Sequence, residues 1–386
     1  MQINLSHKTL HFKTPARTSR GEYSTHSMIV VTILDEKTGR IGLGECAPLP
    51  DLSCDASAYV RMSDVANLID KALKSDDYTE TLRPYPALLF ALESAMYDYQ
   101  QNPLLYDTPF ARAEVGIPTN GLVWMSSYDD MLRQVKEKLL AGFRCIKLKI
   151  GAIGWDEEIR LIETVRSRFS KESLEIRVDA NGAFSPEEAM SRMEQLARYG
   201  IHSIEQPIKQ YQWKEMERLC RNAPLPIALD EELIGVNTLE EKRTLLDTIR
   251  PQYIVVKPTL HGGISGTMEW ISEAQQRNIG AGPVDIAAQI AIACEQLRTV
   301  HKAAAGDAVS IADLKDLADV VGHSIAENVE GRSDHDGCIV RPDEDACQFL
   351  AVLFENLRKN GKTFVGFHLD EEQPVVIIAV DITLVF

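Results

Sequence analysis

The feature that most constrains this chain is an alternation of short apolar segments with amphipathic ones, running from about residue 115 to about residue 280. CIKLKI and LEIRVDA look like strands, and each is followed by a segment with apolar residues at helical spacing, such as WDEEIRLIETVRSRF. Repeated strand–helix units predict a parallel sheet. Six units in a row favour a closed (β/α) TIM-type barrel over an open sheet.

The residues on either side of this alternation have different patterns. Residues 1–112 combine strand-like segments with helical ones such as PALLFALESAMYDYQ, and they predict an α+β domain. The barrel domain is expected over residues 113–282. Residues 283–386 form an atypical segment that completes the barrel in a divergent way, forms a separate small module, or is foreign to the rest of the chain. The fold class is therefore α/β, with two domains expected before the atypical segment.

An ionisable residue stands near the carboxyl end of each strand from CIKLKI onward, about 25 to 30 residues apart. These residues are Lys147 and Lys149, Asp179, Glu205, Asp230 and Lys257. A solvated charge at a strand end would explain any one of them, but five consecutive units in the same phase argue against that explanation. The carboxyl ends of barrel strands meet at one mouth, where active sites lie.

The residue types at these positions predict metal-assisted proton transfer. Three carboxylates without a nearby His or Cys suit a hard divalent cation, with Mg²⁺ the first choice and Mn²⁺ the second. A lysine acts as a general base only if its pKa is lowered, and Lys147 beside Lys149 supplies positive charge for this purpose. A metal flanked by cations would also stabilise the enediolate formed when a proton α to a carboxylate is removed.

Five short motifs carry a resemblance to a known family. KLK (147–149), DAN (179–181), IEQP (204–207), LDE (229–231) and VKP (256–258) resemble the enolase superfamily, in its muconate-lactonizing subgroup, and within it the o-succinylbenzoate synthase family. TSRG (18–21) and GECAPLP (44–50) look like loops of the capping domain that closes over the substrate. The resemblance covers about residues 8 to 280. It implies a lyase of menaquinone biosynthesis that dehydrates 2-succinyl-6-hydroxy-2,4-cyclohexadiene-1-carboxylate.

The resemblance also implies a role for each matched position. Lys149 would be the base and later the acid, and Lys257 would stabilise the enediolate from the opposite wall. Lys147, Ser19 and Arg20 would contact the substrate. The Mg²⁺ ligands would be Asp179, Glu205 and Asp230. Asn181 would contact the metal ligands and hold them in place without binding the metal itself. The alternative is that Asn181 is only a turn residue.

Other polar residues are interpreted as structural. Glu231 and Glu232 are interpreted as solvated charges at a helix start, with orientation of the metal ligands as the alternative, and His261 as a loop histidine without a catalytic role. The acidic loop around His335 reads as solvated rather than as a metal cluster.

Composition narrows the class of partner and the compartment. A formal net charge of −16 argues against binding to nucleic acid and for a small-molecule carboxylate substrate. No segment approaches the roughly 18 apolar residues of a membrane span, and no secretory signal is visible at the N-terminus. Seven cysteines without a CxxC pair indicate reduced thiols in a cytoplasmic protein. The sequence does not specify an oligomeric state.

Two further functions are compatible with the same residues. Lysines on opposite walls could exchange protons on both faces of a substrate, as in an N-succinylamino acid racemase or a related epimerase. A barrel with an atypical C-terminal wall could also be catalytically impaired and serve as a binding protein.

Overall fold

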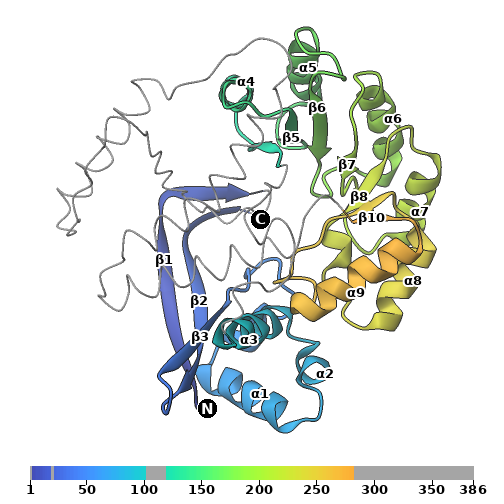
Figure 1. The fold of residues 1–386 in the computed structure, drawn as a ribbon. Helices are drawn as coiled ribbons and strands as arrows, with labels where there is room; N and C mark the ends of the chain where they lie inside the picture. The colour runs from blue at the N-terminus through green and yellow to red at the C-terminus, as the bar shows by residue number, and fades with distance from the viewer. Residues whose placement is uncertain (1, 19–20, 101–118, 282–386) are drawn as a thin grey trace, which may run out of the picture.

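The computed structural model describes residues 2–18, 21–100 and 119–281 (Figure 1). Both expected domain boundaries, 112/113 and 282/283, lie outside these residues and stay predictions, as does the expectation for residues 283–386, which include the acidic loop. No helix in the described ranges is both long and apolar enough to cross a membrane.

The N-terminal part, called the cap below, is an antiparallel sheet covered on one face by helices. The sheet has the order β1-β2-β3. Its strands are β1 (Gln2–Thr18), β2 (Gly21–Asp35) and β3 (Arg40–Cys46). The helices are η1 (Ala56–Tyr59), α1 (Met62–Lys74), α2 (Tyr78–Leu82) and α3 (Pro86–Tyr99).

Helix α3 packs directly on the backbone of β3. A Cβ at Gly44 would lie 1.8 Å from the Ala91 carbonyl oxygen, and one at Gly42 would lie 2.2 Å from the Ala95 carbonyl oxygen. The two glycines of the segment GLGEC are therefore needed for this close approach. The apolar face of β2, including Val31, is buried under the same helix.

The second part is a parallel sheet of seven strands in the order β10-β9-β8-β7-β6-β5-β4, with helices outside it (Figure 1). The strands are β4 (Gly121–Val123), β5 (Cys145–Lys149), β6 (Glu175–Asp179), β7 (Ile204–Glu205), β8 (Ile227–Leu229), β9 (Tyr253–Ile254) and β10 (Gly280–Ala281). Six strands corresponding to the six predicted units are found in order, and β10 follows them as a seventh. The curved sheet with its outer helices confirms the α/β, TIM-type fold.

The helices follow the predicted alternation. They are α4 (Tyr128–Leu140), α5 (Trp155–Arg166), α6 (Pro186–Ala197), α7 (Trp213–Asn222), η2 (Glu231–Leu233), α8 (Leu239–Ile249) and α9 (Gly263–Gln276). Helix α6 begins with a capping box formed by Ser185 and Glu188.

Strands β7 and β9 have only two residues each. After Glu205 the chain turns at Gln206, whose φ is 40°. The backbone still hydrogen-bonds along the sheet beyond these strands, because the Val255 N–H donates to the Leu229 carbonyl oxygen at 2.8 Å.

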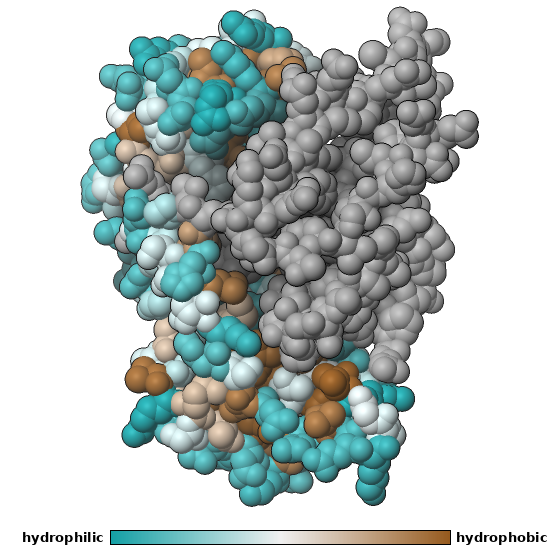
Figure 2. All heavy atoms as spheres, turned by 90° about the vertical axis from the view of Figure 1, so that its left-hand side faces the viewer, coloured by the Kyte–Doolittle hydropathy of each residue, from teal (hydrophilic) through white to brown (hydrophobic). Residues whose placement is uncertain are grey.

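The surface of the described residues is mostly polar where Figure 2 shows it. On the face shown in Figure 2, hydrophilic residues dominate, with hydrophobic ones between them toward the lower end. Large exposed apolar side chains of the described residues include Val60 in the cap and Leu140 at the end of α4.

Candidate active site

The predicted site residues come together at the carboxyl ends of neighbouring strands. Lys149, Asp179 and Glu205 are the last residues of β5, β6 and β7. Asp230 directly follows β8, and Lys257 comes three residues after β9. Since these five strands are consecutive neighbours in the sheet, their ends form one side of a barrel mouth (Figure 1).

The two lysines of β5 share a face of the strand, because they are two residues apart. Ile146 and Leu148 point to the other face, where they are buried in the core between sheet and helices. Lys147 and Lys149 therefore point into the barrel.

Lysines and carboxylates of the site pair directly with one another. The Lys149 Nζ lies 2.6 Å from Asp179 Oδ2, and the Lys147 Nζ lies 3.3 Å from the same oxygen. Lys147 also donates to Glu205 Oε2 at 3.0 Å. Across the mouth, Lys257 donates to Asp230 Oδ2 at 2.5 Å. The mouth is therefore a buried cluster of alternating positive and negative charge.

These pairs determine which charges the cluster favours. Burial works against the charged form of Lys147, but Glu205 and Asp179 outweigh it and raise the pKa of Lys147. Burial likewise opposes ionisation of Asp179, and Lys149 and Lys147 lower the pKa of that carboxyl nevertheless. For Glu205, burial and the charge of Asp179 raise the pKa.

Asn181 contacts Lys149, the lysine expected to act as the base. Its Oδ1 accepts a hydrogen bond from the Lys149 Nζ at 2.9 Å, and its Nδ2 donates to Glu231 Oε1 at 2.9 Å. The residue has φ 44°, a left-handed conformation that Asn tolerates better than most residues. It is thus both a turn residue and a partner of Lys149.

The expectation that Glu231 and Glu232 are solvated charges is wrong. They are 3% and 0% exposed. Glu232 accepts hydrogen bonds from the Gln206 Nε2 at 3.1 Å and from the Tyr211 N–H at 2.7 Å, while Glu231 accepts from Asn181. They are buried because the chain after β8 folds inward as η2 rather than beginning an exposed helix.

Gln206 is a residue of the site that sequence reasoning missed. Its side chain is fully buried, and its Oε1 accepts from the backbone N–H groups of Asp230 at 3.2 Å and Glu232 at 3.1 Å. It therefore ties the end of β7 to the end of β8. Its place inside the IEQP motif was the only signal in the sequence.

The carboxylates fit a hard divalent cation in chemistry and in burial. Glu205 Oε1 and Asp230 Oδ1 are buried and have no hydrogen-bond partner among the described residues. An unpaired buried carboxylate oxygen is costly unless a cation neutralises it. As the side chains lie, no group of three or more His, Cys, Asp or Glu in the described ranges could hold a metal ion, and lysines pair with Asp179 and Asp230 instead.

Two parts of the predicted site cannot be placed. Ser19 and Arg20 lie outside the described residues, so their substrate contacts stay predictions.

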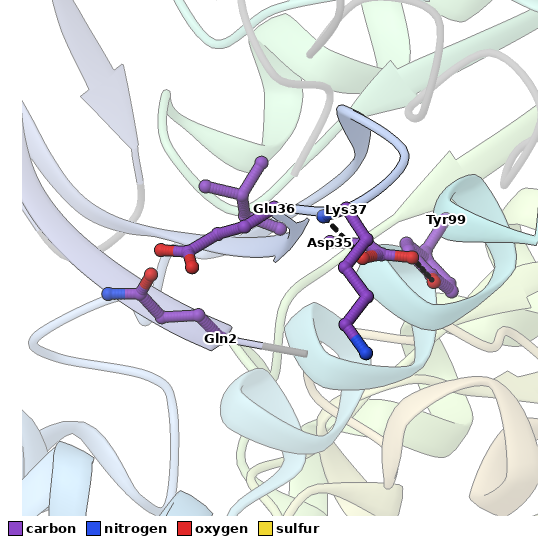
Figure 3. A pocket seen from close by; sticks show the side chains of 6 residues that line it. Gln2, Asp35, Glu36, Lys37 and Tyr99 are labelled. Carbon is purple, nitrogen blue, oxygen red and sulfur yellow. Dashed lines mark hydrogen bonds between the residues drawn. The ribbon is translucent and has the colours of Figure 1, made fainter.

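A hollow of about 440 Å³ lies elsewhere, on the cap (Figure 3). It is lined by Gln2, Leu34, Asp35, Glu36, Lys37 and Tyr99. In it the Tyr99 hydroxyl donates to Asp35 Oδ2 at 3.3 Å. It shares no residue with the barrel mouth.

Comparisons with known proteins find a family to which the chain is similar. Residues 130–345 match the family model described as enolase C-terminal domain-like. The chain is 39% identical over 318 residues to an o-succinylbenzoate synthase of Desulfotalea psychrophila, covering 72% of this chain and 84% of that one.

Solved structures show the same fold. The crystal structure of MenC from Desulfotalea psychrophila is similar with a TM-score of 0.60 and 34% identity, over 78% of this chain and 91% of that one. An o-succinylbenzoate synthase from Thermosynechococcus elongatus, complexed with Mg in the active site, has a TM-score of 0.59 and 22% identity, over 78% and 90% of the two chains.

Proposed function

Since this chain belongs to the enolase superfamily, we propose that it is an o-succinylbenzoate synthase, a lyase that dehydrates 2-succinyl-6-hydroxy-2,4-cyclohexadiene-1-carboxylate. The 39% identity to the Desulfotalea enzyme supports the substrate. The observation that carries the mechanism is the pair of lysines, Lys149 and Lys257, at strand ends four strands apart in the sheet, each paired with a carboxylate.

Lys149 is the proposed base. Its Nζ donates hydrogen bonds to Asp179 and Asn181 at the barrel mouth. A substrate carboxylate bound there would lie near the positive charges of Lys147 and Lys257. As the neutral amine it removes the proton α to the substrate carboxylate. It then returns this proton to the β-hydroxyl, which leaves as water and gives the aromatic product. One C–H and one C–O bond break, and the only by-product is water.

Lys257 and Lys147 are proposed to stabilise the negative charge that develops on the substrate. Both are cations at a largely buried mouth, where an electrostatic interaction is stronger than in water. Lys147 would contact the substrate carboxylate, and Ser19 and Arg20 of the cap would contact the rest of the substrate.

Asp179, Glu205 and Asp230 are proposed to hold Mg²⁺, with Mn²⁺ as a substitute. Their oxygen donors and their unpaired buried atoms support this assignment. When bound, the cation would neutralise charge on the substrate carboxylate and make the α proton more acidic. Asn181 would hold Lys149 in place beside the ligands. The enzyme would act in a reducing compartment such as the cytoplasm.

An N-succinylamino acid racemase is the second candidate. It is favoured by the same placement of Lys149 and Lys257, because a racemase needs one proton-transfer group on each face of the substrate. In the dehydration only Lys149 must exchange a proton, so Lys257 distinguishes the two functions.

The test uses the full chain with Mg²⁺, the cyclohexadiene substrate and, separately, N-succinyl amino acids. We expect aromatic product, and we expect Lys149→Ala to lower kcat by roughly 10²- to 10⁴-fold, the usual contribution of a general base. Lys136→Ala, which removes an exposed lysine of α4, should leave the rate unchanged. Racemisation without aromatic product would favour the second candidate, and no turnover of either would indicate a binding protein.

A further inference from the structure

The segment between β9 and α9 is a tight turn that carries Lys257 at its start. The His261 N–H donates to the Lys257 carbonyl oxygen at 3.0 Å, and the Gly263 N–H donates to the Pro258 carbonyl oxygen at 2.8 Å. Because these bonds close the turn on itself, its residues must move together with the first turn of α9. The place of Lys257 at the mouth therefore depends on where α9 begins.

The ring of His261 fixes the backbone of Lys257 from the other side. The imidazole is fully buried, and its Nδ1 accepts a hydrogen bond from the Lys257 N–H at 2.8 Å. A ring nitrogen that accepts a hydrogen bond carries no proton, so the ring is neutral with its hydrogen on Nε2. Lys257 thus has both its N–H and its carbonyl group bound to the same residue.

The cap holds the other end of the turn through Glu93 of α3. Its carboxylate accepts from the Ile264 N–H at 2.6 Å and from the Ser265 N–H at 3.2 Å. Helix α9 has Gly262 at its N-cap position and no side-chain cap of its own. A carboxylate at this end satisfies free N–H groups and complements the helix dipole. Glu93 is 3% exposed, so this contact lies inside the junction of cap and barrel.

We propose that His261 is a positioning residue for Lys257, and that Glu93 completes the arrangement by fixing the start of α9. The cap thereby determines where a lysine of the barrel mouth lies, although Glu93 itself does not reach the mouth. The consequence for rate rests on the proposed function, whereas the consequence for the Lys257 backbone does not.

A role in filling space alone would be met by any side chain of similar size. His261→Phe keeps the bulk of the ring and removes the acceptor. His261→Asn has less bulk but keeps an acceptor oxygen close to the position of Nδ1. Rescue by Asn and not by Phe therefore distinguishes positioning from packing.

The first measurement is steady-state dehydration of the cyclohexadiene substrate by the full chain. Because misplacing a group by about 1 Å can cost up to about 10²-fold in rate, we expect His261→Phe to lower kcat by roughly 10- to 100-fold with little change in KM. His261→Asn should restore most of the loss. His202→Phe, which alters a half-buried histidine on the loop before β7, is the matched control and should be near wild type. A wild-type kcat in His261→Phe would overturn the proposal.

The second measurement is hydrogen exchange of the Lys257 amide, followed by NMR without substrate. We expect faster exchange in His261→Phe and near wild-type exchange in His261→Asn. Unchanged protection in His261→Phe would show that the ring does not hold this amide and would overturn the proposal. If the wild-type protein fails to dehydrate the substrate, the proposed function is wrong, and the exchange result still decides for or against His261.

The part played by Glu93 is tested with Glu93→Ala. Exchange of the Ile264 and Lys257 amides should rise together in this variant. The control, Glu273→Gln, alters an equally buried glutamate at the far end of α9. A rise at Ile264 without one at Lys257 would show that the cap does not position the lysine.

Discussion

Asn181 combines two demands in one residue, since its backbone is left-handed and its side chain binds the lysine proposed as base. Glycine accepts the same backbone conformation without strain, whereas alanine does not. The two substitutions therefore separate the role of the backbone from the role of the amide.

We expect both Asn181→Gly and Asn181→Ala to lower kcat by roughly tenfold, because a hydrogen bond to a charged group contributes about 1.5 kcal/mol or more. Asn181→Ala should also lower the free energy of unfolding by about 1 kcal/mol more than Asn181→Gly, because only alanine is strained at this positive φ. Steady-state kinetics and urea denaturation provide the two measurements. A wild-type kcat in Asn181→Gly would show that the amide does not assist Lys149.

At the scale of elements, the junction of α3 with α9 depends on a glycine. A Cβ at Gly263 would lie 2.5 Å from Glu93 Oε2 and 2.8 Å from Leu89 Cγ, and the residue has φ 69°. Gly39, in the turn between β2 and β3, has φ 70° with nothing within 4 Å of its Cβ position. The two residues have the same strain and differ only in their surroundings.

Gly39→Ala should therefore destabilise the protein by about 1 kcal/mol through its backbone conformation alone. Gly263→Ala should cost roughly 2 to 4 kcal/mol, because the clash with α3 is added to the strain. Urea denaturation of both variants measures the difference. Equal losses would indicate that α3 and α9 can separate at no cost.

At the scale of the whole molecule, the junction of cap and barrel contains a carboxyl group that titrates near neutral pH. Burial raises the pKa of Glu93 to about 7, from an ordinary value of 4.5, and the charge of Glu269 acts in the same direction. Between these pH values the folded protein holds a proton that the unfolded chain has lost. The contribution of this group to stability is therefore full below pH 4.5 and falls as the pH rises to 7.

Glu93→Gln removes this dependence. Relative to wild type, the free energy of unfolding of the variant should rise by roughly 2 to 3 kcal/mol between about pH 5 and about pH 8. Denaturant titrations of both proteins across this range provide the comparison. A constant difference between the two proteins would mean that Glu93 is ionised throughout.

Metal binding should also be visible in the stability of the whole chain, since a ligand that binds only the folded state stabilises it. We expect Mg²⁺, and also Mn²⁺, to raise the Tm of the wild-type protein and EDTA to reverse the rise. Glu205→Gln should lose most of this shift, whereas Glu187→Gln, at an exposed position of α6, should keep it. Calorimetric scans with and without the cation are sufficient, and an undiminished shift in Glu205→Gln would place the cation elsewhere.

The sequence by itself determined the order of strands and helices and the residues of the barrel mouth. A strand has a period of two and a helix a period near 3.6, so both are visible in a local window. Parallel strands also end at one edge, so a charge near the end of each strand had to reach the same mouth. Lys149, Asp179 and Glu205 followed from these two facts.

Only the tertiary structure decided which contacts hold those residues in place. Glu93 binds the Ile264 N–H across 171 positions of the chain, and no periodic pattern marks such a pair. The burial of Glu232 and the bond from Lys257 to the ring of His261 depend in the same way on how the chain folds after each strand. A local pattern fixes where a side chain points. Whether it meets a partner there depends on residues distant in the sequence, and those are brought together only by packing.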